Sequence, residues 1–506
     1  MDPTLPLPGA PTAPIELAGG AAGATARLPI GGVALEDDFL DRLRDVCASV
    51  SVDPATRAEA SRDWWPLAMI WATEGQVGAL AGAVVRPADA AEVAGVVALC
   101  HAASVPVTAA GGRSSVVGGT VPVHGGVVLD LCALSGIVDV DKVSMIVEVL
   151  PGTFGDALEA ELAAAHGLTV GHWPQSMALS TVGGWLACRG AGQFSNRYGK
   201  IEDIVVGLEV VLADGRTIRT GGQPRQAVGP DLTQLFVGSE GTFGVITRAW
   251  LQAHPQPTHE RKCAFGFPSF TEGLEAMRRI SQRGATPAVM RLYDDVESQR
   301  NHQTPDGVNV LLVLDQGDGT MIEAGMEVVA EECRGAHRLD VALVDHWMEK
   351  RNDVAALEAL IAKGFVVDTM EVAGPWSALP TIFSAATTAI AAVEGTLAVS
   401  THQSHSYQTG GCLYFTFAGK VDAERRDSYY AAAWDAGTRA VLGSGGALSH
   451  HHGVGINRAR FMAEALGPAF DTLVAVKHAL DPEGIMNPGK LGLPSPFGAS
   501  PFDPAS

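Results

Sequence analysis

Histidines gather at two places in the C-terminal half of the chain. Three stand in a row in Ser449-His450-His451-His452-Gly453-Val454-Gly455, and Thr401-His402-Gln403-Ser404-His405-Ser406-Tyr407 adds two beside a tyrosine. Imidazole and phenol groups move protons near neutral pH when their surroundings adjust their pKa values. The flanking glycines argue against a run of surface histidines. We therefore expect a proton-transfer site.

The same histidines also suggest a metal site, because His405 with one of the triple could bind zinc. Neither run contains an aspartate or a glutamate, so we place proton transfer ahead of metal and expect no metal. The seven cysteines are scattered and form no Cys-x-x-Cys pair, which offers neither a thiolate zinc site nor a disulfide framework.

Three glycine-rich loops follow strand-like segments in the first half, at residues 110–119, 171–192 and 238–244. Glycines let successive backbone N–H groups converge on an anion, so such loops can hold a pyrophosphate without lysines. No strand-GxGxxG-helix or GxxxxGK[ST] pattern accompanies them, which argues against a Rossmann or P-loop site. One such loop alone is more simply a tight turn, but three together favour a cofactor.

The length of 506 residues, 47% of them hydrophobic, predicts at least two domains with large cores. The formal charge of −21 argues against a nucleic-acid partner. The N-terminus lacks a basic region followed by an apolar run, and no apolar stretch is long enough to span a bilayer. We expect a cytoplasmic homodimer that acts on a small molecule or lipid, with room for peripheral membrane contact.

Helical spacing of apolar residues predicts helices over 35–47, from Asp89 onward and over 154–165. Strands are expected over 105–108, 126–131 and 145–150, and a hairpin turns at Ala213-Asp214-Gly215. Two prolines in 254–257 suggest a domain boundary. The order of elements indicates an α+β fold.

Four segments together resemble the vanillyl-alcohol-oxidase superfamily of FAD enzymes: Ser449 to Gly455, Ser180-Thr181-Val182-Gly183-Gly184-Trp185, Tyr198-Gly199-Lys200-Ile201-Glu202-Asp203, and Gly238 to Thr247. Within it the chain is most similar to the alkylglycerone-phosphate synthase branch. The resemblance implies a flexible leader (1–34), a two-part FAD-binding domain (35–254), a cap or substrate domain (255–452) and a C-terminal segment that completes the FAD domain (453–506).

The resemblance also implies which residues hold FAD in the three loops. They are Thr108, Ala109, Ala110, Gly111, Gly112, Arg113 and Ser114; Gln175, Ser176, Ser180, Thr181, Gly183, Gly184, Cys188, Arg189, Gly190 and Ala191; and Glu240, Gly241, Thr242, Gly244, Val245 and Ile246. Relatives with covalent flavin often carry a histidine where Arg113 stands, so we expect non-covalent FAD.

In the synthase branch, a tyrosine and the histidine triple act on acyl-dihydroxyacetone phosphate, whose acyl group is exchanged for a fatty alcohol without net redox change. The corresponding residues here are Tyr407 and His450, His451 and His452, with His172 and Arg291 as further site candidates.

The chain departs from the synthase pattern at the arginine that binds the substrate phosphate. Counting back from Glu371-Val372-Ala373-Gly374-Pro375-Trp376 places Leu357 there, and Arg351 fits only if the helix has shifted. The alternative is an FAD-dependent oxidase or dehydrogenase of an alcohol or 2-hydroxyacid. Related hydroxyacid dehydrogenases, however, carry a metal-binding glutamate where His451 stands. A third hypothesis is a catalytically silent flavin-binding protein.

Overall fold

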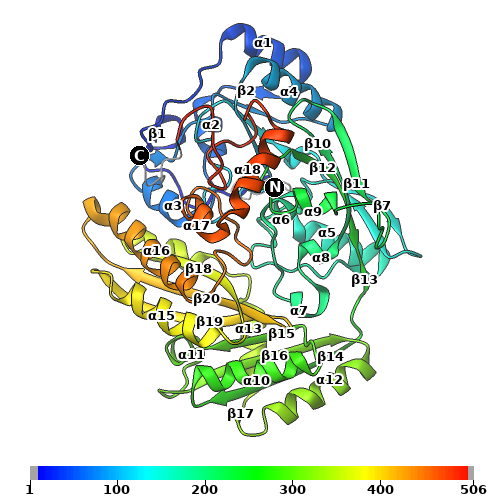
Figure 1. Ribbon diagram of the computed structural model, residues 1–506, viewed down its shortest axis with the longest axis vertical. Helices are drawn as coiled ribbons and strands as arrows, with labels where there is room; N and C mark the ends of the chain where they lie inside the picture. Colours follow the sequence, from blue (N-terminus) through cyan, green and yellow to red (C-terminus); the bar gives the residue numbers. More distant parts are fainter. Residues whose placement is uncertain (1–9, 500–506) are drawn as a thin grey trace.

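The computed structural model describes residues 10–499 and confirms the α+β fold. Figure 1 shows two parts, an upper part and, below it, a part built on one large sheet that we call the cap. The first sheet of the upper part has the order β2-β4-β6-β5. Its strands are β2 (Val50–Ser51), β4 (Ala83–Val85), β6 (Val127–Asp130) and β5 (Val107–Ala110). Strands β4, β6 and β5 run parallel, so their carboxyl ends share one edge.

The second sheet of the upper part is antiparallel, with the order β11-β10-β12-β8-β7. Its strands are β11 (Thr217–Gly221), β10 (Val205–Val211), β12 (Val245–Gln252), β8 (Ile146–Val149) and β7 (Ile137–Asp141). The predicted hairpin is confirmed, since Leu208 pairs with Thr220 across β10 and β11. The sequence reasoning did not find β7, in which Ile137 and Val140 are only partly buried and the other three residues are exposed.

Helices pack on both sheets of the upper part. They are α1 (Asp37–Val46), α2 (Pro54–Ala60), α3 (Pro66–Ala72), α4 (Ala90–Ala103), α5 (Gly155–Glu161), α6 (Val182–Cys188), α7 (Ser195–Tyr198), α8 (Ile201–Ile204) and α9 (Leu232–Phe236). The predicted helix at Asp89 is confirmed: the Asp89 carboxylate accepts the N–H groups of Ala91 and Glu92 and so caps α4. Buried Val93, Val96 and their neighbours make its inner face.

The cap is a seven-stranded sheet with the order β17-β14-β16-β15-β19-β20-β18. Its strands are β17 (His337–Leu339), β14 (His259–Phe267), β16 (Asn309–Gly317), β15 (Val289–Tyr293), β19 (Thr396–Ser406), β20 (Gly410–Gly419) and β18 (Val366–Pro375). Its helices are α10 (Phe270–Gln282), α11 (Asp295–His302), α12 (Gly319–Glu332), α13 (Ala342–Lys350), α14 (Ala355–Ala362), α15 (Leu379–Ala391) and α16 (Arg426–Gly443). Figure 1 shows α15 and α16 side by side over the β18–β20 end of this sheet.

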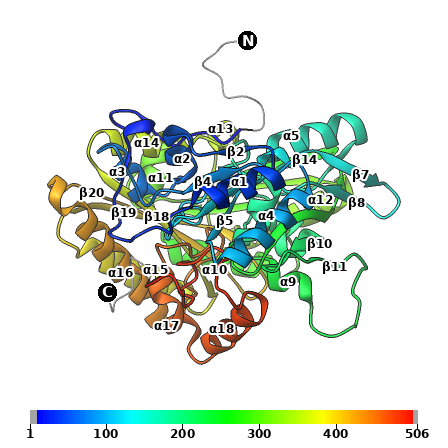
Figure 2. The ribbon, with the colours of Figure 1, turned by 90° about the horizontal axis from the view of Figure 1, so that it is seen from above.

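The last segment returns to the upper part, as its red colour shows in Figures 1 and 2. It contains α17 (Met462–Leu466) and α18 (Ala469–Leu480). Val107 of β5 exchanges backbone hydrogen bonds with this segment, donating to Ile485 (2.8 Å) and accepting from Asn487 (2.7 Å). The buried Lys477 ammonium donates to the carbonyls of Thr242 and Met486, both at 2.8 Å. These contacts fix the tail against the cofactor loops.

Residues 10–34, for which composition predicts a flexible leader, pack along the upper part. Leu17 is buried, and the Thr12 carbonyl accepts the indole N–H of Trp64 at 3.2 Å. Strand β1 (Thr25–Ala26) pairs with β3 (Gln76–Val77). A proline-rich extended segment keeps its carbonyls free, so side-chain donors can hold it without a sheet. Residues 1–9 of the predicted leader and 500–506 of the predicted tail lie outside the described residues.

Between residues 10 and 499, none of the helices combines the length and the apolar composition needed to cross a bilayer.

Candidate active site

The first two glycine loops meet so closely that side chains would not fit between them. A Cβ on Gly111 would lie 2.2 Å from Thr181 Oγ1, and a Cβ on Gly112 would lie 2.0 Å from the carbonyl oxygen of Leu179. Both glycines follow β5 at the edge where the parallel strands end. Ligands of such sheets bind outside the carboxyl ends of the strands.

The third loop joins them through the C-terminal tail. Asn487 Nδ2 donates to the carbonyls of Gly119 (3.1 Å) and Glu240 (2.6 Å), and so ties the first loop to the third. Glu240 N donates to Ala187 O at 2.8 Å, which ties the third loop to the second. Arg113, Arg189, Glu240 and Asn487 all have positive φ angles of 40° to 61°. Such strain in non-glycine residues concentrates at ligand sites.

These loops fit a pyrophosphate-bearing cofactor such as FAD. Close-packed backbone with few charged side chains is what a dinucleotide cradle needs. His172 adds a second sign: it is fully buried against Trp185, with ring centroids 4.5 Å apart, and neither ring nitrogen has a hydrogen-bond partner among residues 10–499. Burial lowers the pKa of His172 to about 3, so the ring is neutral. A buried polar ring without partners points to a group that completes the site.

Several side chains predicted at FAD are occupied within the protein. Ser180 Oγ donates to Ser176 O and accepts from the Trp185 indole at 2.7 Å. The Thr181 hydroxyl caps α6 by accepting from Gly184 N. From these residues the cofactor would be held mainly by backbone.

Other predicted cofactor residues point away from the loops or lie in the core. The Arg189 guanidinium turns to Glu202 (3.3 Å), and the Gln175 amide donates to Asp353 O of the cap at 2.9 Å. Val245 and Ile246 belong to β12 and are buried in two hydrophobic clusters. The similarity of sequence motifs locates a loop well but does not say which way each side chain faces.

On the cap side, Tyr407, His450 and His451 form one hydrogen-bonded chain. Tyr407 Oη lies 2.7 Å from His450 Nε2, and His450 Nδ1 lies 2.8 Å from His451 Nδ1. Tyr407 directly follows β19, and the histidines lie in the irregular segment between α16 and α17. Tyr407 and the first two of the three predicted histidines are therefore brought together, with Tyr407 and His450 43 residues apart in the sequence.

Protonation states follow from burial and from the hydrogen-bond geometry. Burial, with the Lys200 charge nearby, lowers the pKa of His450 to about 3, and burial raises the pKa of the Tyr407 phenol well above its usual value. A protonated phenol must donate to a neutral ring, so His450 accepts at Nε2 and carries its one hydrogen on Nδ1. That hydrogen points to His451 Nδ1, which leaves the His451 hydrogen on Nε2.

The other predicted site residues lie around this chain without joining it. His452 turns away: its Nδ1 lies 3.5 Å from Glu371 Oε2 and makes no hydrogen bond within the described part of the chain. Arg291 Nη2 donates to His402 Nε2 at 2.7 Å, and His402 Nδ1 lies 3.1 Å from Glu297. Because His402 accepts from Arg291, its hydrogen is on Nδ1. Arg291 Nε is buried, and no described residue accepts its hydrogen.

Leu357 cannot contribute a cation; it is partly buried and packs against a large hydrophobic cluster that is shared by the cap and the upper part. Arg351 is held elsewhere, at the seam between the two parts. Its Nη1 donates to Gln193 Oε1 at 2.9 Å, and its guanidinium lies over Trp173 (5.5 Å) and Phe194 (5.1 Å). Within residues 10–499 Arg351 has no ion pair, and burial lowers its pKa.

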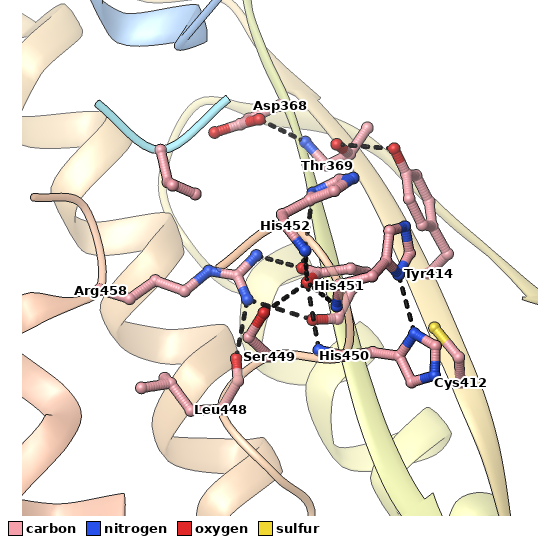
Figure 3. Close-up of polar contacts among 12 residues, drawn as sticks. Asp368, Thr369, Cys412, Tyr414, Leu448, Ser449, His450, His451, His452 and Arg458 are labelled. Atoms are coloured by element: carbon pink, nitrogen blue, oxygen red, sulfur yellow. Dashed lines mark hydrogen bonds and ion pairs between the residues drawn. The ribbon is translucent and has the colours of Figure 1, made fainter. Parts of the chain in front are cut away.

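The sequence reasoning missed several residues that surround the histidines. Ser195 Oγ lies 2.7 Å from His405 Nδ1, and the His405 ring stacks on His450 at 4.8 Å. The Lys200 ammonium donates to the His450 carbonyl at 2.7 Å. The Glu371 carboxylate accepts hydrogen bonds from this loop and pairs with Arg458. Figure 3 shows Leu448 to His452 and Arg458 around this point. Isolated serines and charged residues carry no sequence pattern that would have revealed these roles.

One group of residues also has metal-binding geometry. The ligand atoms of His405, His450 and His451 all lie within 4.8 Å of one another. Three neutral imidazoles are a ligand set that zinc accepts. Two of these nitrogens already share a hydrogen, however, and a metal would have to displace it.

Two family models match the chain. The one described as "FAD binding domain" covers residues 81–221, and "FAD linked oxidases, C-terminal domain" covers residues 256–491. The first includes the first two glycine loops and the second includes the whole cap sheet and the histidine loop.

Characterised and uncharacterised relatives share most of this length. The uncharacterized FAD-linked oxidoreductase YgcU of Escherichia coli (strain K12) is 33% identical over 81% of this chain and 88% of its own. Alkyldihydroxyacetonephosphate synthase of Dictyostelium discoideum is 30% identical over 82% and 74%. Glycolate oxidase subunit GlcD of Bacillus subtilis (strain 168) is 27% identical over 81% and 88%.

Solved structures agree on the fold. An alkyldihydroxyacetonephosphate synthase structure aligns with a TM-score of 0.77 at 25% identity, covering 94% of this chain and 90% of the other. P-cresol methylhydroxylase aligns with a TM-score of 0.72 at 17% identity, over 92% and 98%, which supports the fold alone.

Proposed function

Because this chain belongs to the vanillyl-alcohol-oxidase and p-cresol-methylhydroxylase family of FAD-linked enzymes, with FAD as its cofactor, we propose that it catalyses acyl-to-alkyl exchange of the alkyldihydroxyacetonephosphate-synthase type. The observation that carries the proposal is the hydrogen-bonded chain of Tyr407, His450 and His451. It places a phenol and two neutral imidazoles in series beside the cofactor loops.

FAD, when bound, supplies a two-electron acceptor and an electrophilic ring position. The glycine loops after β5, before α6 and before β12 would hold it through backbone N–H groups, and Arg113 at the covalent-attachment position makes a non-covalent cofactor the simpler expectation. The Arg113 guanidinium is itself engaged near Asp130, at 3.9 Å. The chain thus offers no nucleophilic ring at that point.

The hydrogen-bonded chain lets Tyr407 serve as a base even though its phenol is protonated at rest. His450 would take the Tyr407 proton at Nε2 as it passes its Nδ1 proton to His451 Nδ1. His451 would then carry hydrogens on both nitrogens as a cation, and Tyr407 would be a phenolate. The Tyr407 oxygen could then receive a proton from the substrate carbon or hydroxyl. Proton transfer of this kind by a positioned side chain contributes about 10²- to 10⁴-fold to a rate.

An anionic group on the substrate would meet Arg291 rather than residue 357. Arg291 has a buried Nε–H without a partner, and its neighbour His402 is neutral because burial and the Arg291 charge lower its pKa to about 4. A guanidinium with an unused donor suits a phosphate or carboxylate. This assignment keeps a phosphorylated substrate compatible with the leucine at position 357.

A second candidate is an FAD-dependent oxidase or dehydrogenase of an alcohol or 2-hydroxyacid. The observation that favours it is Leu357, which packs against a hydrophobic cluster and leaves the synthase phosphate position without a cation. The similarity to glycolate oxidase subunit GlcD is compatible with this reading.

A spectral screen of the FAD-bound protein separates these functions. An oxidase or dehydrogenase should bleach the flavin with an alcohol or hydroxyacid and recover with oxygen or a dye. A synthase should exchange acyl for alkyl on acyl-dihydroxyacetone phosphate without consuming an acceptor. A spectrum that no candidate substrate perturbs would favour a silent flavin-binding protein and overturn the proposal.

A further inference from the structure

The histidine loop, residues 449–455, has no regular secondary structure, so side chains must fix its shape. One oxygen of Glu371, on β18 of the cap, accepts from four donors in this loop. They are Ser449 Oγ at 2.6 Å and the backbone N–H groups of His450 (3.1 Å), His451 (2.9 Å) and His452 (2.7 Å). Three successive amides that converge on one carboxylate oxygen form an anion-binding concavity filled by the protein's own side chain.

The second oxygen of Glu371 is paired with Arg458 Nη2. Arg458 also donates to the Leu448 carbonyl at 2.9 Å and lies over the Trp434 ring at 4.9 Å. Glu371 and Arg458 are both fully buried. Burial alone would raise the pKa of Glu371, but Arg458, His452 and the Ser449 hydrogen bond hold it well below the usual range. Glu371 is therefore a carboxylate at neutral pH.

A second carboxylate, from the cofactor side, holds the other end of the loop. Glu240 accepts the N–H groups of Val454 at 2.5 Å and Gly455 at 2.8 Å. A Cβ on Gly453 would lie 2.6 Å from Glu240 Oε1, so only glycine permits this approach. From the same side, the Lys200 ammonium holds the His450 carbonyl. The histidine loop is thus hydrogen-bonded at one end to β18 of the cap and at the other end to the third glycine loop.

We propose that Glu371 is a positioning residue: it sets the His450 and His451 rings at hydrogen-bonding distance from Tyr407, while Glu240 fixes the same loop to the cofactor side. The inference rests on the proposed role of these histidines in proton transfer. It extends that role by naming the groups that hold the rings, none of which moves a proton itself. Removing the Glu371 carboxylate should make the His450 and His451 rings more mobile while FAD stays bound.

The decisive comparison uses two double variants, Glu371→Gln/Arg458→Met and Glu371→Leu/Arg458→Met. Both remove the buried charges at similar volume, and only the first keeps an oxygen that can accept the three amides. Asp368→Asn is the matched control, because Asp368 is a buried carboxyl on the same strand that holds Trp434 (2.9 Å) and Tyr430 instead of the loop.

The readout is the rate at which diethyl pyrocarbonate modifies the peptide with His450, His451 and His452, measured by mass spectrometry on FAD-bound protein. We expect the Leu double variant to react at least about tenfold faster than the Gln double variant, with Asp368→Asn near wild type and flavin absorbance retained in all. Equal rates in the two double variants, or an equal rise in Asp368→Asn, would overturn the proposal.

The labelling needs no substrate, so its outcome is separate from the proposed function. If a substrate is found, the Leu double variant should lower kcat while KM stays near that of the Gln double variant. A merely structural role for Glu371 would lower the melting temperature of both double variants alike without separating their labelling rates or their kcat values. Should the Leu double variant fail to fold, Ser449→Ala, which removes one of the four donors, should raise labelling about twofold, and no rise would contradict the proposal.

Discussion

The cofactor loops are joined mainly through backbone, whereas the histidine loop is surrounded by buried ionisable side chains. In the first region, Gly111 and Gly112 touch Thr181 and Leu179 with no room for a Cβ. In the second, Glu371, Arg458 and Lys200 hold the loop, and the rings they hold carry the proton chain.

The difference indicates what each region can tolerate. Glycine backbone packed this closely resists any added volume, because the facing group cannot move away without moving a strand or helix end. A network of buried charges resists the loss of any one member, since the partner left behind remains desolvated. The same enzyme therefore has a region sensitive to size beside one sensitive to charge and hydrogen bonding.

Tyr407→Phe should produce the largest effect, because it removes only the hydroxyl that begins the proton chain. We expect turnover to fall about 10²- to 10⁴-fold, the range that general acid-base groups contribute. FAD absorbance and melting temperature should stay near wild type, since the ring volume is kept. Turnover within a few fold of wild type would mean that the histidine region does not act through this chain.

Gly112→Ala tests the cofactor region. The new Cβ would meet the Leu179 carbonyl at 2.0 Å, and overpacking costs typically about 1–3 kcal/mol. We expect FAD to bind roughly 10- to 100-fold more weakly, at about 1.4 kcal/mol per tenfold, as measured by titrating apoprotein with FAD. Gly443→Ala is the control, because a Cβ there meets nothing within 4 Å. Unchanged FAD affinity in Gly112→Ala would contradict the view that the cofactor region is sensitive to added side-chain volume.

Each region contains a buried histidine that should make the stability of the fold depend on pH. Burial lowers the pKa of His172 and His450 to about 3 each, so below about pH 6.5 the unfolded chain binds protons that the folded protein refuses. As the pH is lowered below about 6.5, the free energy of unfolding should decrease, by up to about 1.4 kcal/mol per pH unit for each such ring. Replacing either ring, as in His172→Phe or His450→Gln, should reduce this slope by up to one proton between pH 4 and 6. Urea unfolding at several pH values measures it, and an unchanged slope would mean that the ring is protonated in the fold.

Local patterns made much of the fold and part of the site predictable. Asp89 predicted the start of α4, because an N-cap side chain accepts from the amides two and three residues later in the sequence. The glycine loops were likewise visible in the sequence, since each is a short run whose backbone freedom belongs to its own residues. The pairing of Tyr407 with His450 was predicted only through the family resemblance.

The supporting network could not be predicted from single residues. Glu371 and Arg458 are separated by 87 residues and come together because β18 of the cap lies against the loop before α17. Nothing in the residue type of Glu371 distinguishes it from a surface glutamate. The same holds for Leu357, where counting along the sequence located the departure but only packing showed that the side chain faces the core.

Removing metal should have the smallest effect of all. His450 Nδ1 and His451 Nδ1 lie 2.8 Å apart and share one hydrogen, whereas two nitrogens bound to zinc at about 2.0–2.1 Å in a tetrahedral site are roughly 3.3 Å apart. His405 uses Nδ1 for Ser195, so only its Nε2 is left for a metal. The resting geometry therefore suits a hydrogen bond better than a shared cation.

We accordingly expect dialysis of the FAD-bound enzyme against a chelator to leave turnover within about twofold. Added Zn²⁺ should slow turnover, because binding at the three rings would displace the hydrogen that Tyr407 depends on, and the chelator should reverse it. His405→Gln should weaken this inhibition, since it removes one of the three ligands. Loss of activity on chelation that Zn²⁺ restores would instead make the histidine region a metal centre. The two regions would then differ because one binds FAD and the other binds a metal. They would not differ as close-packed backbone differs from side chains that transfer protons.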